Sequence, residues 1–226
     1  MRRIRMALVT AVALAASTLS VASPAYAAGD TQLGIDVGNI AWEQYTSTNA
    51  DVQARLSETS TEDCNFYTGF WTDPANDRND GTASTYGKCG KTTNGYMYRD
   101  GTKAWGPVAW RKRQWCADFA KFAFYWGGAK YTGLTAAAGS FRTYGINNGT
   151  WHGRGSGYVP RKGDAVVYDW DGNGSYDHVA IVTSYYDTST DGNHYVVGGN
   201  QSDGVTHPQY SNWASSIVGY ASPAAR

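Results

Sequence analysis

The sequence predicts an α+β fold in which helices pack on an antiparallel β-sheet. Residues 115–126 (WCADFAKFAFYW) carry apolar side chains at helical spacing and precede a Gly-Gly pair, which is typical of a buried helix and its end. Residues 165–168, 179–186 and 194–197 are strand-like runs rich in Val and Tyr. The links between them are short and rich in Asp, Gly and Asn, which favours an antiparallel meander.

The chain begins with a segment typical of a secretory signal. Three arginines within the first five residues precede an apolar run, and an Ala-Tyr-Ala sequence closes the segment at residue 27. We therefore expect residues 1–27 to be removed and residues 28–226 to form a single domain, secreted to the extracellular space or the cell wall. No later run is long and apolar enough for a membrane helix, so we expect no membrane partner.

The charge of the mature chain bears on its partners. The whole chain has 19 basic and 19 acidic residues, and loss of the three signal arginines leaves 16 basic residues against 19 acidic ones, a net charge of −3. Such a domain is not expected to bind nucleic acid. Its 17 Tyr and 9 Trp can fill the core or stack on sugar rings, and the sequence leaves both uses open. We expect a monomer.

The region before the predicted helix divides into two parts. Residues 36–56 are helix-competent, whereas residues 57–110 are rich in turn residues and aromatics, which predicts an irregular insertion. An exported chain with three cysteines suggests one disulfide and one free thiol. Cys64 and Cys89 flank a turn-rich stretch, and closing this loop of 26 residues would stabilise the fold by about 3.5 kcal/mol. Cys116 is then free.

Cys116 lies in the first turn of the predicted helix. The positive end of the helix dipole and the free backbone N–H groups at this position favour a thiolate over a thiol. The same N–H groups can hold an oxyanion. Cys116 is therefore the candidate nucleophile, and the alternative is a small buried hydrophobic residue.

A cysteine nucleophile needs a base, and the base needs an orienting partner. If the second and third strand-like runs form a hairpin centred near Thr190, His178 lies opposite positions 200–202. Asn200 is then placed beside His178, where its amide can orient the imidazole. The preceding link sets Tyr168 opposite His178 on the other side. His178 is therefore the candidate base.

The other three histidines are weaker candidates. His207 follows Asn200 closely enough to line the same cleft and is the alternative base, although Pro208 after it suggests a loop with no fixed partner. His152 lies in a Gly-rich stretch and His194 at the opposite end of the hairpin. Both are expected at the surface.

Residues 169–177 resemble part of a calcium loop, with Gly at position 6 and side-chain oxygens at positions 1, 3, 5 and 9, namely those of Asp169, Asp171, Asn173 and Asp177. Position 12 is Ala180, which cannot supply the bidentate carboxylate. We therefore expect a plain hairpin turn and neither a metal nor another cofactor.

Four motifs resemble those of the CHAP family, cysteine- and histidine-dependent amidohydrolases and peptidases with a papain-like fold. They are WCADF at 115–119, PRKGDAVVYDW at 160–170, DHVAIV at 177–182 and GGN at 198–200, which match in order and spacing. The resemblance implies a catalytic core over residues 115–204. It also implies hydrolysis of peptidoglycan amide bonds, either in the stem peptide or cross-bridge or between the sugar and the first alanine.

Carried over by position, the resemblance implies that Cys116 is the nucleophile, His178 the base and Asn200 a polar partner. Many members have Glu two residues before that Asn, where this chain has Gly198, so the orienting role passes to Asn200. Two other functions stay open. One is a catalytically inactive module that binds cell-wall glycan, and the other is a secreted cysteine peptidase that acts on ordinary protein.

Overall fold

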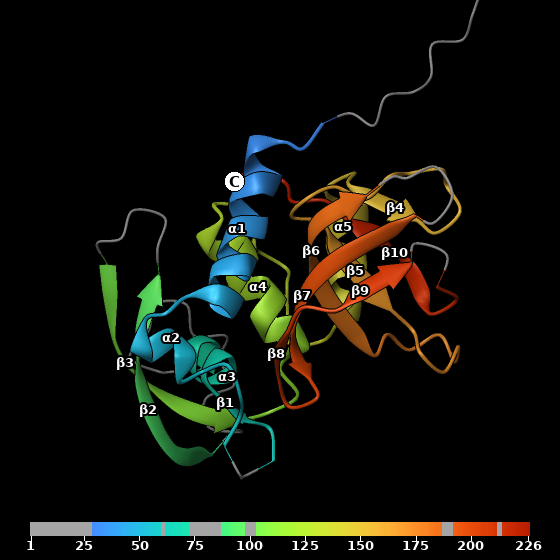
Figure 1. Ribbon diagram of the computed structural model, residues 1–226. Coiled ribbons are helices and arrows are strands. Elements are labelled where there is room, and N and C mark those ends of the chain that lie inside the picture. The colour runs from blue at the N-terminus through green and yellow to red at the C-terminus, as the bar shows by residue number, and fades with distance from the viewer. Residues whose placement is uncertain (1–28, 60–61, 73–86, 98–102, 187–191, 212–213) are drawn as a thin grey trace, which may run out of the picture.

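The computed structural model describes residues 29–59, 62–72, 87–97, 103–186, 192–211 and 214–226, and it shows an α+β fold with two antiparallel sheets (Figure 1). The larger sheet lies on one side of the molecule, the smaller one lies on the other, and helices lie between them. The predicted fold class is confirmed. The expected signal segment, 1–27, lies outside the described residues.

The N-terminal helical segment is divided in two, α1 (Gln32–Thr46) and α2 (Ala50–Gln53). The Thr31 hydroxyl accepts from the backbone N–H of Gly34 and caps the start of α1, while the Asn49 side chain caps α2. Ser47 is extended, and this ends α1. Helix α1 therefore begins before the predicted 36–56 segment and stops well inside it.

Helix α4 (Cys116–Trp126) occupies the centre of the fold, as predicted. Its residues from Cys116 to Phe124 are all buried, so the helix packs on every side and not only along the face given by its apolar spacing. Helix α5 (Gly139–Asn147) follows it and contacts the larger sheet at β10 (Ile217–Ala221).

The larger sheet has the order β4-β10-β5-β6-β7-β8, and β9 also pairs with β7. Besides β10, the strands of this sheet are β4 (Trp151–Gly153), β5 (Ala165–Tyr168), β6 (His178–Tyr186), β7 (Asn193–Gln201), β8 (Gly204–Thr206) and β9 (Gln209–Ser211). The predicted meander is confirmed as β5-β6-β7, all antiparallel. The sequence did not predict β10, which lies between β4 and β5.

Both faces of this sheet are buried, because alternate residues of its strands enter two different clusters. Odd-numbered residues such as Val167, Val179 and Ile181 join the main core with α4. Even-numbered residues such as Val166 and Val182 form a second cluster on the opposite face. The sheet is thus fixed from both sides, which holds the strand ends that carry the candidate site.

The segment 57–110 is not irregular where the structure describes it. It contains β1 (Cys64–Asn65), α3 (Phe66–Thr72), β2 (Lys88–Met97) and most of β3 (Lys103–Lys112), and the three strands form the smaller sheet. The aromatic residues of α3 are fully buried and pack against α4. The sequence predicted an irregular insertion because the segment is rich in turn residues, but the aromatic residues of α3 belong to the core. The Cys64–Cys89 disulfide is present, as expected.

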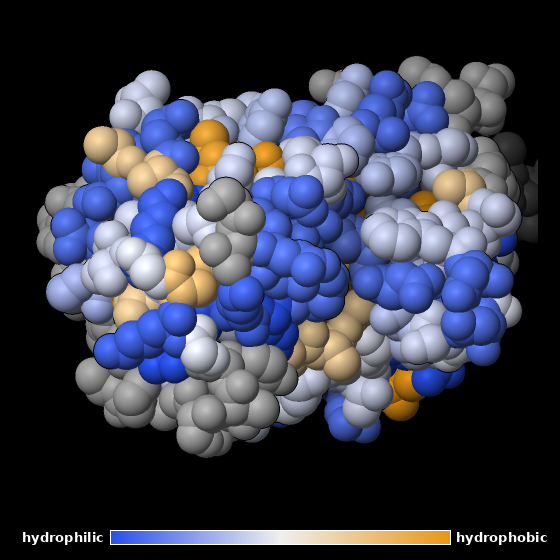
Figure 2. Space-filling model, turned by 90° about the horizontal axis from the view of Figure 1, so that it is seen from below, coloured by the Kyte–Doolittle hydropathy of each residue, from blue (hydrophilic) through white to orange (hydrophobic). Residues whose placement is uncertain are grey.

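The surface facing the viewer in Figure 2 is mostly hydrophilic, and its hydrophobic residues occur in small separate areas. Large hydrophobic side chains exposed within the described part of the chain are Trp42, Tyr45, Ile146 and Trp170. Among the described residues, every helix is too short or too polar to span a bilayer.

Candidate active site

Cys116 is the first residue of α4, and its thiol is free of any disulfide. The Sγ atom lies 4.0 Å from the carbonyl oxygen of Asp177, and the backbone N–H of Val179 donates to the thiol. These two residues flank His178. The structure therefore brings the predicted nucleophile against the backbone that carries the predicted base.

The thiol of Cys116 is neutral at rest. Its side chain is only 8% exposed, and this burial raises the pKa of the thiol to about 11. The backbone N–H groups of Val179 and Ala117 lower that pKa, but by less than burial raises it. The sequence predicted a thiolate because the helix start supplies N–H groups, and it could not show that desolvation exceeds their effect.

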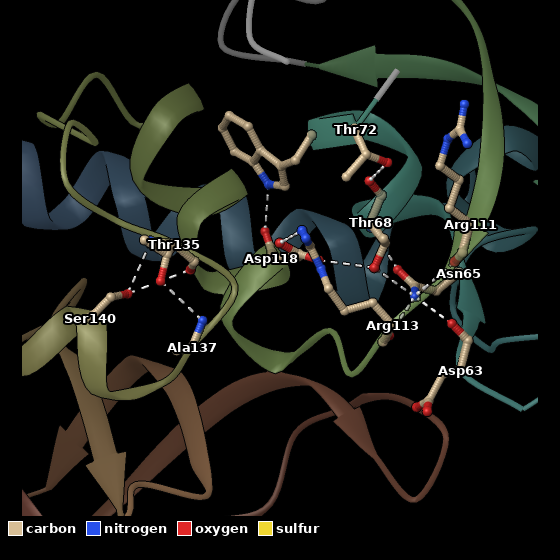
Figure 3. Close-up of polar contacts among 11 residues, drawn as sticks. Asp63, Asn65, Thr68, Thr72, Arg111, Arg113, Asp118, Thr135, Ala137 and Ser140 are labelled. Atoms are coloured by element: carbon tan, nitrogen blue, oxygen red, sulfur yellow. Dashed lines mark hydrogen bonds and ion pairs between the residues drawn. The ribbon is translucent and has the colours of Figure 1, made fainter. Parts of the chain in front are cut away.

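A buried ion pair holds the first turn of α4 (Figure 3). The Asp118 carboxylate accepts two hydrogen bonds from Arg113, at 3.0 and 2.7 Å, and one from the Thr68 hydroxyl at 2.9 Å. Asn65 donates in turn to Thr68, and the Trp71 indole donates to the carbonyl of Asp118. These contacts join α4 to β1 and α3, and they fix the position of Cys116 two residues earlier.

His178 begins β6 and pairs with Tyr168 of β5, as predicted. The imidazole is 1% exposed, and this burial lowers its pKa to about 4. The ring of Trp170 stacks on it at 5.1 Å between centroids, with 16° between the planes. Trp170 is itself 55% exposed and so covers the imidazole from the solvent side. The sequence did not predict this role, although Trp170 ends a family motif.

The expected hydrogen bond between Asn200 and His178 is not made. The Asn200 amide donates instead to Gln114 at 2.9 Å and to Asp63 at 3.4 Å. Its φ angle is +56°, in the left-handed region, and a bulge in β7 accompanies this turn of the backbone. The strand register did bring position 200 to the correct end of the sheet, but the bulge turned its side chain away.

His207 lies in a separate pocket. Its Nε2 is 3.1 Å from the hydroxyl of Thr183, five residues after His178 in β6, and its ring stacks on Tyr195 with 19° between the planes. Trp42 makes a T-shaped contact with the same imidazole, with 4.8 Å between the ring centroids. The pocket holds about 460 Å³, and Lys162 also lines it. The structure thus separates His207 from Cys116, contrary to the expectation that it lines the same cleft.

The two histidines expected at the surface differ in burial. His194 is fully buried, which corrects the prediction, because the neighbouring β9 and the second cluster cover this end of β7. The ring of His152 is partly exposed and stacks on Tyr158 at 3.6 Å between centroids.

The turn before His178 gathers three carboxylates, from Asp169, Asp171 and Asp177, whose oxygens lie within 4.8 Å of one another. These groups could hold a cation. However, backbone N–H groups already donate to them, from Gly174 to Asp169 and from Trp170 to Asp177. The backbone of the loop therefore supplies hydrogen-bond donors to its own carboxylates.

The family model of the CHAP domain matches residues 79–200. This is more than half of the chain, and the match includes Cys116, His178 and Asn200. The chain therefore belongs to the CHAP family, and its α+β fold is papain-like. The match begins inside the segment that was expected to be an insertion. Neither the curated proteins nor the solved structures gave a match.

Membership of this family makes the protein a hydrolase of the cell-wall amidase or peptidase class.

Proposed function

We propose that the protein is an exported cysteine hydrolase that cleaves amide bonds of bacterial peptidoglycan through a thioester on Cys116. The observation that carries the proposal is the position of the Cys116 thiol, at a helix start and against the backbone on both sides of His178. A buried cysteine beside the backbone of a buried histidine supplies the two residue types that acyl transfer requires.

The Cys116 thiol and the His178 imidazole are both neutral before the reaction, because burial raises the pKa of the first and lowers that of the second. This sets the order of proton transfer. The thiol passes its proton to His178 as Sγ attacks the amide carbonyl, and His178 returns that proton to the leaving amine. The N–H groups at the start of α4, where Trp115 gives no side-chain cap, hold the oxyanion. Water then attacks the thioester, the acid product leaves and the thiol is restored. The chain's own residues perform each of these steps.

Digestion of purified sacculi, followed by mass spectrometry of the released fragments, tests the activity and identifies the bond. Cys116→Ala should abolish lysis, and His178→Ala should be nearly as damaging, because no other described group is placed to take the thiol proton. Asn200→Ala should be much milder, since its amide bonds to Gln114 and Asp63. Lysis by all three variants at the parent rate would refute the proposal. Circular dichroism checks that each variant folds.

The pocket around His207 favours a second function, glycan binding. Its aromatic walls and polar groups, Lys162 and Thr183, suit the faces and hydroxyls of a sugar ring. Binding of Cys116→Ala protein to sacculi, lost on Trp42→Ala, would support this function. If the parent binds sacculi but releases no fragment, the binding module replaces the enzyme. If it instead digests casein and leaves sacculi intact, the protein is a secreted peptidase.

A further inference from the structure

One ring nitrogen of His178 lacks a hydrogen-bond partner among the described residues. Its Nε2 atom is buried, and no described residue makes a hydrogen bond with it. An unpaired polar atom inside a protein is unfavourable, and a neutral imidazole that acts as a base needs its second nitrogen fixed. Asn200 does not supply this partner, because its amide bonds elsewhere.

The surroundings of Gly198 show which group lies beside that nitrogen. A Cβ atom built on Gly198 would lie 3.1 Å from His178 Nε2 and 2.7 Å from the Oε1 atom of Gln201. The imidazole nitrogen and the amide oxygen therefore border the same small space. They can be no further apart than the two distances together, about 5.8 Å. One bridging water spans two such groups, and a small rotation of the amide would bring them into direct contact.

The bulge in β7 is what places Gln201 there. Gly198 pairs with Thr206 and Gln201 with Gly204, so the step along β7 is one residue longer than the step along β8. In a regular strand Asn200 would share a face with Gly198. The extra residue moves Gln201 to that face, where it is only 9% exposed.

The Gln201 amide is held in one orientation. The Thr206 hydroxyl donates to Oε1 at 2.7 Å, and the amide nitrogen donates to the Tyr210 hydroxyl at 3.3 Å. A carbonyl oxygen has two lone pairs, so Oε1 keeps one acceptor site after it binds Thr206. The oxygen, and not the nitrogen, is thus the end of the amide that borders His178.

We propose that Gln201 is the positioning residue of the site: its Oε1 accepts the hydrogen bond from His178 Nε2–H, directly or through one water. This role rests on the proposed function. It fixes the tautomer in which Nδ1 is the free base and exchanges the proton with Cys116. Gln201 thereby replaces the Glu that many family members carry at the position of Gly198.

Nitrogen-15 NMR of the imidazole tests the tautomer at pH 7 without a substrate. The parent should hold its proton on Nε2, and Gln201→Met, which keeps the volume and removes the acceptor, should give a mixture of tautomers. Lysis of sacculi should fall about 100-fold, as for a misplaced reacting group. Gln209→Met is the matched control, because Gln209 is exposed and bonds to Tyr195, and it should change neither measurement.

Thr206→Val provides a second variant in case Gln201→Met does not fold. It frees the amide to rotate and should shift the tautomer ratio in the same direction. A parent proton on Nδ1, or an unchanged tautomer in both variants, would overturn the role of Gln201 even if lysis is normal. If the parent does not lyse sacculi but its tautomer responds to Gln201, the proposed function fails while the positioning role stands.

Discussion

Replacement of Arg113 tests how the first turn of α4 is held. Arg113→Met removes the guanidinium and leaves the Asp118 carboxylate, whose side chain is 1% exposed, without its ion-pair partner. Removing one member of a buried pair commonly costs 3–5 kcal/mol, on the order of a third of a domain's stability. Two hydrogen bonds to Asp118 are lost. The hydrogen bond from the Thr68 hydroxyl remains, and so does the favourable charge of the nearby Lys121. We therefore expect the lower end, about 3 kcal/mol.

The loss should depend on pH in a definite direction. Burial raises the pKa of Asp118 and Arg113 opposes this, so the variant has a more strongly raised pKa. A carboxyl group with a raised pKa in the folded state stabilises the fold at low pH and loses that contribution as pH rises. The difference between parent and variant should therefore be larger at pH 8 than at pH 5.

Urea unfolding of the disulfide-bonded protein at both pH values measures the effect. Arg154→Met is the matched control, because Arg154 is exposed and bonds to a backbone carbonyl, and a surface change of this kind should alter stability by less than about 0.5 kcal/mol. A loss below about 1 kcal/mol for Arg113→Met, or a loss equal at both pH values, would refute the reasoning.

Three further predictions concern the thiols and the acidic turn. Replacing Cys64 and Cys89 together by Ala should lower the free energy of unfolding by about 3.5 kcal/mol, and peptide mapping should find only these two cysteines linked; a parent-like urea midpoint would contradict this. Because burial raises the pKa of Cys116 to about 11, its rate of alkylation by iodoacetamide should rise steadily from pH 7 to pH 10, whereas a plateau from pH 5 would indicate a thiolate–imidazolium pair. A chelator should leave the melting temperature and lysis unchanged, because backbone N–H groups already bind the carboxylates of the 169–177 turn; a loss restored by calcium would show that a cation is needed.

The parts of the fold that the sequence predicted are those with a strong local signal. Helix α4 has helical apolar spacing and a Gly-Gly end, and β5 and β6 are apolar runs bounded by turn residues. The segment 57–110 was misjudged because the part that the structure describes depends on distant contacts: α3 is stable because its aromatic residues pack against α4. Composition alone does not reveal such contacts.

The strand register around the candidate site was predicted correctly, but the contacts of its side chains were not. Hairpin arithmetic put position 200 at the end of the sheet near His178, but it assumed regular alternation. A bulge of one residue exchanges the faces of Asn200 and Gln201, and nothing in the local sequence requires a bulge there. The charge of Cys116 was misjudged for a similar reason, since burial is a property of the whole fold.

The position of β10 in the larger sheet affects the order in which the strands of that sheet can pair. This strand lies between β4 and β5 and supplies Ile217 and Tyr220 to the second cluster. Ribosomes make the chain from its N-terminus, and β10 follows every other described strand of this sheet in the sequence. Until β10 has been made, β4 and β5 have no strand between them, and the β5-β6-β7 meander has an open edge. The sheet that carries His178 can therefore close only after the last of its described strands along the sequence has been made.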